Sequence, residues 1–427
     1  MIKKIIPFII AGALTGMAAL SGETDMRDLD SSMRRLTRSG KDAVKHPCLS
    51  RDGRRMLYMT EPPVGEDAEK TIRIMDLYNG KEKELFRDNQ RQAPEPYAES
   101  MLVIGTKPPL LSGDGETAVF VLGMSEPHGI MDHFMAVADL EEPSIKIISF
   151  SIPTLEKKDL HSLEFDSADW ERISHYALSD NGDRLACVVK GHLGPQRYGY
   201  ASGIVLMDLK MNTQEMLLAP DFTGEAWTWP GFPQRPLMGG GWAFGLSGNG
   251  KSVLFGARSS SDTTDYDLYL TDWDTKKTRA ITDFHDRWFS LADIDHDGKR
   301  IVFFYSGKKK EGMGTYALTA GSPSIRKLES RITPRIEFID MSPDGRFIVY
   351  KHVYKGLIMN LQSGREFVAF DEKTPGYPGG LTPMDFPALP SFWTPQIMTS
   401  NGHDILLIGP PAGKETSEIY LLHIGND

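Results

Sequence analysis

The sequence predicts an all-β fold, a single seven-bladed β-propeller with four antiparallel strands in each blade. Three observations lead to this prediction: a turn motif recurs seven times, an apolar run follows each copy, and further strand-like segments follow most of the runs. Repetition of one small antiparallel unit is typical of propellers, because no single unit can bury its own apolar face. A chain of 427 residues also exceeds what one ordinary hydrophobic core serves.

The turn motif centres on a glycine that follows Asp or Asn in every copy. The seven glycines are Gly53, Gly115, Gly182, Gly250, Gly298, Gly345 and Gly402. Three residues before the glycine stands Ser or Thr in six of the copies. An Asp-Gly or Asn-Gly pair adopts the positive φ angles of a tight turn, and a nearby hydroxyl or carboxylate can bond the turn backbone. The motif therefore predicts a hairpin between the first and second strands of each blade.

The two ends of the chain are expected to meet in one blade. The seventh copy runs out of sequence after its third strand, whereas MRRLTR (33–38) precedes the first copy and has no unit of its own. We expect this segment to supply the missing fourth strand and to close the ring, with the blades spanning about residues 44–425. Closure removes the open sheet edges that invite aggregation.

Residues 1–22 predict a signal peptide, because two lysines precede an apolar run and small residues at 19 and 21 offer a cleavage site. An uncleaved anchor is the alternative, but the run falls short of the roughly 20 residues that a spanning helix needs. Glu23 stands where a lipidated cysteine would be, so no lipid anchor is expected. Residues 23–427 are then one soluble domain, periplasmic or secreted, with no membrane span after removal of the signal.

Charge and cysteine content limit the classes of function. The net charge of −10 argues against binding to nucleic acid through bulk charge. The two cysteines, Cys48 and Cys187, fall in blades too far apart for a disulfide, so we expect two buried free thiols. The sequence also has no nucleophile elbow, P-loop or dinucleotide fingerprint.

Ser342-Pro343-Asp344-Gly345 with the following FIVYK, and RRLT near Arg34, resemble the repeats of the TolB-like propeller family. The resemblance covers about residues 33–425 and implies a WD-like propeller fold. It implies little about function, because such blades occur in translocation proteins, surface proteins, lyases and peptidase gating domains. The separate α/β domain of TolB has no counterpart between the predicted cleavage site and the closing strand, so its partner contacts are not carried over.

The longest connections are expected at one end of the propeller. Topology places the turns after the first and third strands at one end, and the second-to-third loops and blade-to-blade links at the other. Long loops on a rigid scaffold commonly carry binding residues. The candidate ligand-binding residues in or beside these loops are Trp227, Trp229, Arg235, Trp242, His192, Arg197, Tyr198, His285, Arg287 and Trp393. The aromatic rings would stack on sugars or grip a peptide, or else pack beneath their own loops.

The segment Asp293-Ile294-Asp295-His296-Asp297-Gly298 has the opening pattern of an EF-hand calcium loop. Phe304 stands at the twelfth position in place of Glu, which excludes an EF-hand. A looser calcium turn, or a site for another divalent metal, on Asp293, Asp295 and Asp297 is a weak alternative to a simple hairpin turn. No cofactor is predicted, and the scattered histidines support a metal centre only weakly.

The sequence favours an exported binding module that engages an envelope protein or a glycan through its loop-rich end. The alternative is a metal-assisted carbohydrate lyase or hydrolase with its site at the mouth of the channel. No catalytic residue is assigned, and enzymatic activity, ligand identity and oligomeric state stay open. Convergence of His or carboxylate side chains would favour the enzyme, and a broad aromatic and polar surface would favour the binding module.

Overall fold

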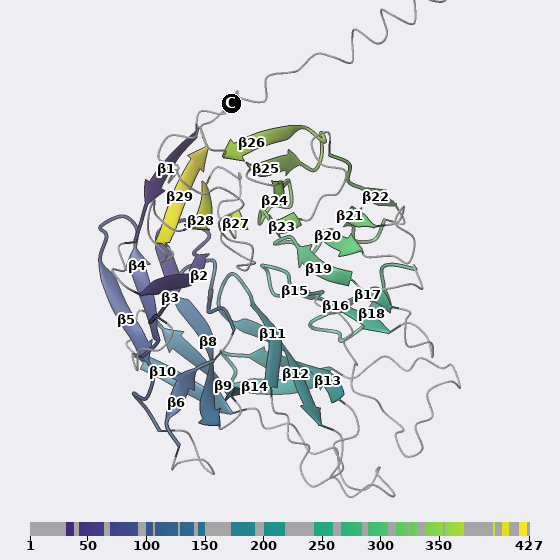
Figure 1. The fold of residues 1–427 in the computed structure, drawn as a ribbon. Helices are drawn as coiled ribbons and strands as arrows, with labels where there is room; N and C mark the ends of the chain where they lie inside the picture. Colours follow the sequence, from purple (N-terminus) through teal and green to yellow (C-terminus); the bar gives the residue numbers. More distant parts are fainter. Residues whose placement is uncertain are drawn as a thin grey trace, which may run out of the picture.

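The computed structural model is an all-β propeller built from antiparallel sheets that stand side by side around a common centre (Figure 1). The structure describes residues 31–37, 42–63, 69–92, 100–105, 107–126, 129–140, 144–149, 172–192, 200–217, 243–258, 266–283, 289–305, 313–322, 324–330, 338–352, 355–370, 396–397, 404–409 and 418–424. The predicted signal peptide and Gly402 lie outside these residues.

The first three sheets are called blades 1 to 3. Blade 1 contains β2 (Ala43–Leu49), β3 (Arg55–Glu61), β4 (Thr71–Asp76) and β5 (Glu82–Arg87). Blade 2 contains β6 (Leu102–Ile104), β7 (Leu110–Leu111), β8 (Thr117–Glu126), β9 (Gly129–Asp139) and β10 (Ser144–Ser149). Blade 3 contains β11 (Arg172–Leu178), β12 (Arg184–His192), β13 (Tyr200–Asp208) and β14 (Thr213–Leu217).

Blades 4 to 6 follow in chain order. Blade 4 contains β15 (Phe244–Leu246), β16 (Ser252–Arg258), β17 (Tyr266–Asp272) and β18 (Thr278–Ala280). Blade 5 contains β19 (Phe289–Ile294), β20 (Arg300–Tyr305), β21 (Gly314–Thr319) and β22 (Ile325–Lys327). Blade 6 contains β23 (Phe338–Met341), β24 (Phe347–His352), β25 (Lys355–Asn360) and β26 (Glu366–Phe370).

The remaining sheet, the terminal sheet, joins the two ends of the described chain. Its strands are β27 (Gln396–Ile397), β28 (Asp404–Gly409), β29 (Glu418–Ile424) and β1 (Ser31–Arg35). Strand β1 pairs with β29 in the register Arg35↔Tyr420, and the Leu36 N–H donates to the Ile419 carbonyl at 2.8 Å. The N-terminal strand therefore pairs with the C-terminal one as the sequence predicts, but it begins two residues before the expected 33–38.

The predicted four-stranded antiparallel blade is confirmed, but among the residues that it describes the structure shows six blades, blades 1 to 6, and not the predicted seven. Blade 2 is the exception to the strand count. Six sheets among the described strands have four strands, whereas blade 2 has five. Its first strand is divided into β6 and β7, and both pair with β8. Pro108 and Pro109 stand between the two pieces. Because proline has no N–H to donate to a ladder, it interrupts the strand.

The recurring motif forms the predicted hairpin turn in all six copies that the structure describes, where the glycines have φ between 65° and 74°. In blade 1 the buried Ser50 hydroxyl donates to Oδ1 of Asp52 at 2.6 Å and accepts the N–H of Arg55 at 2.9 Å. The equivalent serines of blades 2, 3, 4 and 6 bond an Asp or Asn in the same way. The buried hydroxyl thus bonds both a side-chain oxygen and a backbone N–H of the turn.

Backbone hydrogen bonds also join the hairpin turns of consecutive blades. The N–H of Arg51 donates to the Gly113 carbonyl at 2.7 Å, and the N–H of Asp180 donates to the Gly248 carbonyl at 2.7 Å. Bonds from Asp114 to Asp180, from Asn249 to His296 and from His296 to Pro343 continue the series from blade 2 to blade 6. The turns therefore form a hydrogen-bonded belt around the centre of the propeller.

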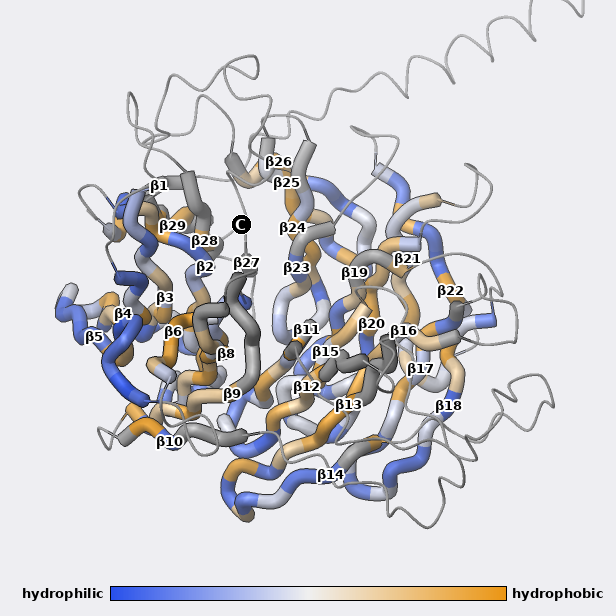
Figure 2. Tube along the Cα trace, turned by 60° about the horizontal axis from the view of Figure 1, so that its bottom comes forward, coloured by the Kyte–Doolittle hydropathy of each residue, from blue (hydrophilic) through white to orange (hydrophobic). Residues whose placement is uncertain are grey.

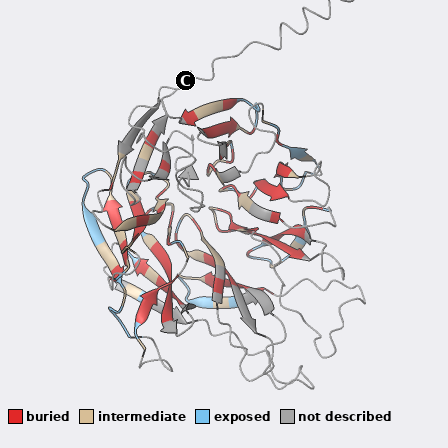
Figure 3. Ribbon diagram, in the orientation of Figure 1, coloured by how far each residue is buried: buried red, intermediate tan, exposed pale blue. Residues whose placement is uncertain are grey.

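The hydrophobic core lies between successive sheets. Phe86 of blade 1 and Phe120 of blade 2 are buried against each other, with ring centroids 5.7 Å apart. Similar clusters mix side chains of blades 2 and 3, 3 and 4, 4 and 5, and 5 and 6, and of the terminal sheet and blade 1. The apolar stretches follow the strands (Figure 2), and the second strands are more buried than the outermost β5, β18 and β22 (Figure 3). Full burial of one such side chain contributes about 1.5–3 kcal/mol.

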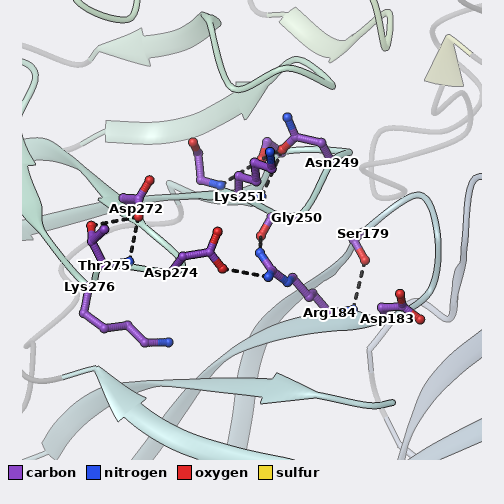
Figure 4. Close-up of polar contacts among 12 residues, drawn as sticks. Ser179, Asp183, Arg184, Asn249, Gly250, Lys251, Asp272, Asp274, Thr275 and Lys276 are labelled. Atoms are coloured by element: carbon purple, nitrogen blue, oxygen red, sulfur yellow. Dashed lines mark hydrogen bonds and ion pairs between the residues drawn. The ribbon is translucent and has the colours of Figure 1, made fainter. Parts of the chain in front are cut away.

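Arg184 links blades 3 and 4 beside the belt (Figure 4). Its Nη1 donates to the Gly250 carbonyl at 3.0 Å, and its Nη2 lies 2.7 Å from Oδ1 of Asp274. The guanidinium also lies 5.2 Å from the centroid of the buried Trp273 ring. Arg55 and Arg300 reach the next blade's turn carbonyl from the equivalent position in blades 1 and 5. These arginines therefore bond blade 1 to blade 2, blade 3 to blade 4 and blade 5 to blade 6.

Candidate functional site

The two ends of the propeller differ as the topology predicts. The N–H of Leu77, in the turn after β4, donates to the Arg54 carbonyl in the turn after β2, at 2.7 Å. Leu361 and Arg346 make the same bond in blade 6. We call the end that carries both kinds of turn the turn end, and the opposite end the loop end.

Most predicted ligand-binding residues lie outside the described residues, and the structure says nothing of them. These are Trp227, Trp229, Arg235, Trp242, Arg197, Tyr198, His285, Arg287 and Trp393. His192 is the last residue of β12, where its backbone pairs with Tyr200. The role of these loops in binding stays a prediction.

At the turn end, three ionisable side chains from blades 1, 3 and 5 meet on the axis. Nη1 of Arg51 lies 2.9 Å from Oδ2 of Asp180 and 2.9 Å from Nδ1 of His296. The third side of this triangle is the 2.5 Å contact between Nδ1 of His296 and Oδ2 of Asp180. We call these three residues the axial cluster. They occupy the same place in their hairpin turns, directly after the first residue of the motif.

Glycines in the intervening blades make room for the axial cluster. Gly113 and Gly248 occupy the equivalent turn position in blades 2 and 4. A Cβ at Gly113 would lie 2.8 Å from Cβ of Asp180. A Cβ at Gly248 would overlap Oδ2 of Asp180 and lie 2.5 Å from Nδ1 of His296. The alternation of glycine with a charged or imidazole side chain is therefore a steric requirement, and it is the sequence signal that could have identified the cluster.

The axial cluster keeps hydrogen-bonding capacity that its members do not use on one another. About a third of each side chain is exposed, 33% for Arg51, 29% for Asp180 and 31% for His296. Among the described residues, the guanidinium of Arg51 makes side-chain hydrogen bonds only through Nη1. Its Nε and Nη2 groups are donors without a partner there, and Oδ1 of Asp180 is an acceptor without one.

The three aspartates considered as metal ligands point to different partners. Oδ2 of Asp293 accepts the N–H of Met341 in blade 6 at 3.0 Å, whereas Oδ1 of Asp295 accepts the N–H of Lys299 at 2.7 Å. Asp297 is exposed and lies 3.3 Å from Nζ of Lys299. Among the residues that the structure describes, no three His, Cys, Asp or Glu side chains are arranged to hold a metal ion.

Asp293 and Asp340 form a carboxyl pair on the first strands of blades 5 and 6. Both carboxyls accept the same N–H, that of Met341, each at 3.0 Å. Burial raises the pKa of Asp293, whereas hydrogen bonds from Asp340 and from the backbone of Ile294 and Met341 act in the opposite direction. The pair therefore favours retention of a proton between its two carboxyls. Sequence reasoning placed Asp293 in a turn and missed Asp340.

The cysteines are free, as predicted, but only Cys187 is fully buried. Cys48 lies on β2 with a half-buried side chain, and its Sγ accepts the N–H of Leu111 at 3.3 Å. Burial, together with the charge of Asp340, raises the pKa of Cys48 to about 11, although the backbone contact with Leu111 lowers it. Burial also raises the pKa of Cys187. Both thiols are therefore protonated and weakly nucleophilic at neutral pH.

At the loop end, a bulge in β2 shapes the start of the innermost strand of blade 1. The register between β2 and β3 shifts between Lys45 and Cys48, and His46 has a φ of 52°. A positive φ at a residue other than glycine is uncommon, and bulges next to functional sites re-aim side chains. Burial and the charge of Lys45 lower the pKa of His46, despite the opposite effect of Glu61. The imidazole is therefore neutral at neutral pH.

Two ammonium groups share one carboxylate beside this bulge. Nζ of Lys45 contacts Oε2 of Glu61, and Nζ of Lys70 lies 3.6 Å from its Oε1. Burial raises the pKa of Glu61, but the hydrogen bonds and charges of Lys45 and Lys70 outweigh burial and lower it overall. Lys45 is 44% exposed. The three residues together carry one net positive charge, and we call them the lysine pair with Glu61.

Comparison with solved structures supports the propeller fold. An oligogalacturonate lyase in complex with manganese matches with a TM-score of 0.58 and 13% sequence identity, over 94% of this chain and 95% of that one. The oligogalacturonate lyase from Vibrio parahaemolyticus matches with a TM-score of 0.58 and 12% identity, over 92% and 97%. A prolyl endopeptidase matches with a TM-score of 0.51 and 12% identity, over 91% of this chain and 51% of its own.

These likenesses show a β-propeller. No family model matches the sequence, and no curated protein does. At 12–13% identity the structural neighbours establish the fold and leave the activity open. In the part of the chain that the structure describes, no helix has the length and apolar character that a membrane-spanning helix needs.

Proposed function

We propose that this protein is an exported β-propeller binding module that engages an envelope glycan carrying acidic groups at its loop end. The observation that carries the proposal is the lysine pair with Glu61. Within these three residues one carboxylate faces two ammonium groups, which leaves one positive charge among them, and an anionic sugar supplies the complementary charge. The apolar signal-like segment at residues 1–22 supports export to the periplasm or beyond.

The placement of the lysine pair supports recognition at this end. Lys45 lies in the first half of β2, which runs from the loop end toward the hairpin at Ser50, and Glu61 is the last residue of β3. Lys70 directly precedes β4. All three therefore stand where the second-to-third loop and the blade-to-blade links emerge, and the sequence predicts that the candidate aromatic residues lie in connections at the same end. Aromatic faces and cationic groups together suit an acidic sugar.

A scaffold closed into seven blades fits this proposal. Strand β2 contacts β28 and β29 of the terminal sheet, and β23 of blade 6 contacts β27. We propose that the terminal sheet is the seventh blade and completes the ring, in the manner of TolB-like propellers. A closed ring would hold the loops of all blades in fixed relative positions, which a multivalent glycan site needs.

The second candidate function is a metal-assisted carbohydrate lyase. The similarity to two oligogalacturonate lyases, one of them in complex with manganese, over almost the whole of this chain favours it. The described residues do not offer a fitting set of three metal ligands. We therefore derive no metal-assisted step from them. The binding module is the first proposal because the lysine pair with Glu61 lies among the described residues.

A binding assay with paired charge variants tests the proposal. The purified chain is expected to bind immobilised polygalacturonate and to ignore a neutral galactan. Lys45→Gln with Lys70→Gln should weaken this binding at least about tenfold, because two charge-assisted contacts are lost. Lys81→Gln with Lys251→Gln makes the same change in net charge at exposed positions of the turn end and should leave binding unchanged.

A variant that should strengthen binding distinguishes a change in the site from loss of the fold. Glu61→Gln frees both lysines and should strengthen binding to polygalacturonate, whereas a damaged fold would weaken it. If the Lys45/Lys70 variant and the Lys81/Lys251 variant weaken binding equally, the effect comes from net charge alone. The loop end is then not the site. Manganese-dependent appearance of unsaturated products at the ultraviolet absorbance of their double bond would establish the lyase in place of the binding module.

A further inference from the structure

We propose that the axial cluster at the turn end is a second binding site, which takes a carboxylate group. This site is distinct from the loop end proposed above, since Arg51 lies in the turn that follows β2, whereas Lys45 lies in the first half of that strand. Three turns that are far apart in sequence bring Arg51, Asp180 and His296 to one point, and the last two are 116 positions apart in the sequence. Convergence of a cation, a carboxylate and an imidazole from distant segments is one of the observations by which a candidate ligand site is recognised.

The unused groups of the cluster determine what it can bind. Arg51 engages Asp180 and His296 through Nη1 alone, so its Nε and Nη2 edge stays available among the described residues. That edge is the planar fork that binds a carboxylate with two parallel hydrogen bonds. About a third of the Arg51 side chain is exposed, so a ligand can approach this residue from solvent.

The carboxylate of Asp180, which belongs to the axial cluster, determines which ligand charge the cluster prefers. Asp180 neutralises the guanidinium in part, so the cluster attracts a monoanion more readily than a dianion such as phosphate, which Asp180 would repel. Its free Oδ1 can accept an N–H or O–H from the body of the ligand. A planar monoanion therefore fits better than a tetrahedral dianion.

The steric frame of the site is rigid. Gly113 and Gly248 leave space that no other residue could leave, because a Cβ at either position would collide with Asp180. The belt of backbone hydrogen bonds fixes the turns that carry all three side chains. A site that is already formed loses little conformational entropy when it binds a small ligand.

Acetate is the first probe, and its effect on thermal unfolding is the readout. At constant ionic strength, with chloride replaced stepwise by acetate, the melting temperature of the wild type should rise in a saturable manner, because a ligand that binds only the folded state stabilises it. Arg51→Gln should lower the affinity at least about tenfold, and Arg51→Lys, which keeps the charge and loses the fork, should lower it by a smaller factor. Arg54→Gln, in the same turn, is the control and should behave as the wild type.

Asp180→Asn keeps the test decisive if the Arg51 variants are unstable. Removal of the competing carboxylate frees the guanidinium, so half-saturation should occur at several-fold lower acetate, a gain that damage to the fold cannot produce. An acetylated tripeptide with a free C-terminus is then compared with its C-terminal amide. Tighter binding of the free acid than of acetate assigns a peptide chain end as the source of the carboxylate, and equal affinity assigns a free small acid.

Two results would overturn the proposal. One is an acetate response that is absent, or that is the same in the wild type, Arg51→Gln and Arg54→Gln. The other is an Asp180→Asn variant with folded structure and no gain in affinity. Variants of Lys45 and Lys70 at the loop end should leave the acetate response unchanged, so failure of the glycan proposal and failure of this one are separate outcomes.

Discussion

Nδ1 of His296 lies 2.5 Å from Oδ2 of Asp180, although one residue belongs to the hairpin of blade 5 and the other to the hairpin of blade 3. The carbonyls and N–H groups of both residues also take part in the belt that joins the turns of blades 1 to 6. The contact therefore depends on the spacing of three successive blades. A change in the packing of blades 3, 4 and 5 should therefore alter the distance between these two atoms.

Gly182→Ala is predicted to destabilise the protein more than Gly53→Ala does. Both glycines occupy the same turn position with φ near 70°, so both substitutions carry the same backbone strain. A Cβ at Gly182 would overlap Oγ1 of Thr117 in blade 2, whereas a Cβ at Gly53 meets nothing within 4 Å. The difference in free energy of unfolding, measured by denaturant titration, should be about 1–3 kcal/mol. Equal destabilisation would show that contact between blades contributes nothing at this position.

Arg184→Lys is predicted to lower the free energy of unfolding by about 1–2 kcal/mol. An ammonium group cannot bond the Gly250 carbonyl and lie over the Trp273 ring at the same time, as the guanidinium does. The ion pair with Asp274 contributes little because that carboxylate is 57% exposed. Arg279→Lys, at an exposed position on β18, is the matched control, and chemical denaturation measures both variants. A loss in the control as large as in Arg184→Lys would contradict the prediction.

Asp340→Asn is predicted to flatten the pH dependence of stability. Burial raises the folded-state pKa of Asp293 above its ordinary 3.8, so its contribution to stability is fully present below pH 3.8 and is lost as the pH rises through the folded-state pKa. In the variant, Oδ1 of the amide would still accept the Met341 N–H, and its NH₂ would donate permanently to Asp293. The variant should therefore gain stability relative to the wild type as the pH rises above 3.8.

Denaturation curves at a series of pH values from 3.5 to about 8 test the Asp340→Asn prediction. Asp297→Asn, at an exposed turn position, is the control and should run parallel to the wild type. A uniform loss of stability in Asp340→Asn at every pH would show that the two carboxyls do not share a proton.

Both cysteines are predicted to resist thiol reagents in the native protein. A pKa of about 11 leaves about one Cys48 thiol in a thousand ionised at pH 8, roughly a hundredfold fewer than for a thiol with the ordinary value of 9.0. Cys187 is buried, and its pKa is raised further. Labelling at pH 8 should modify neither residue within the time that modifies both in denaturant. Rapid labelling of Cys48 alone would indicate an open path to β2.

The sequence determined the repeat. Asp-Gly or Asn-Gly after a hydroxyl residue dictates a hairpin through local hydrogen bonds and positive φ, so each turn is encoded within about six residues. The pairing of β1 with β29 could also be deduced, because an unpaired N-terminal strand and an incomplete last unit each lack what the other supplies. The exception was blade 2, where Pro108 and Pro109 divide the first strand.

Only the tertiary structure decided what the turns do together. Arg51, Asp180 and His296 are ordinary turn residues in their own hairpins, and nothing within six residues of any one of them indicates a partner. Packing of the blades around one axis brings them within 3 Å of one another, because the belt aligns equivalent turn positions and the intervening glycines leave the space. The pairing of Asp293 with Asp340 has the same origin, since the two carboxyls become neighbours only when blades 5 and 6 pack side by side. Local chemistry therefore fixes each hairpin, whereas the meeting of distant side chains depends on the geometry of the assembled sheets.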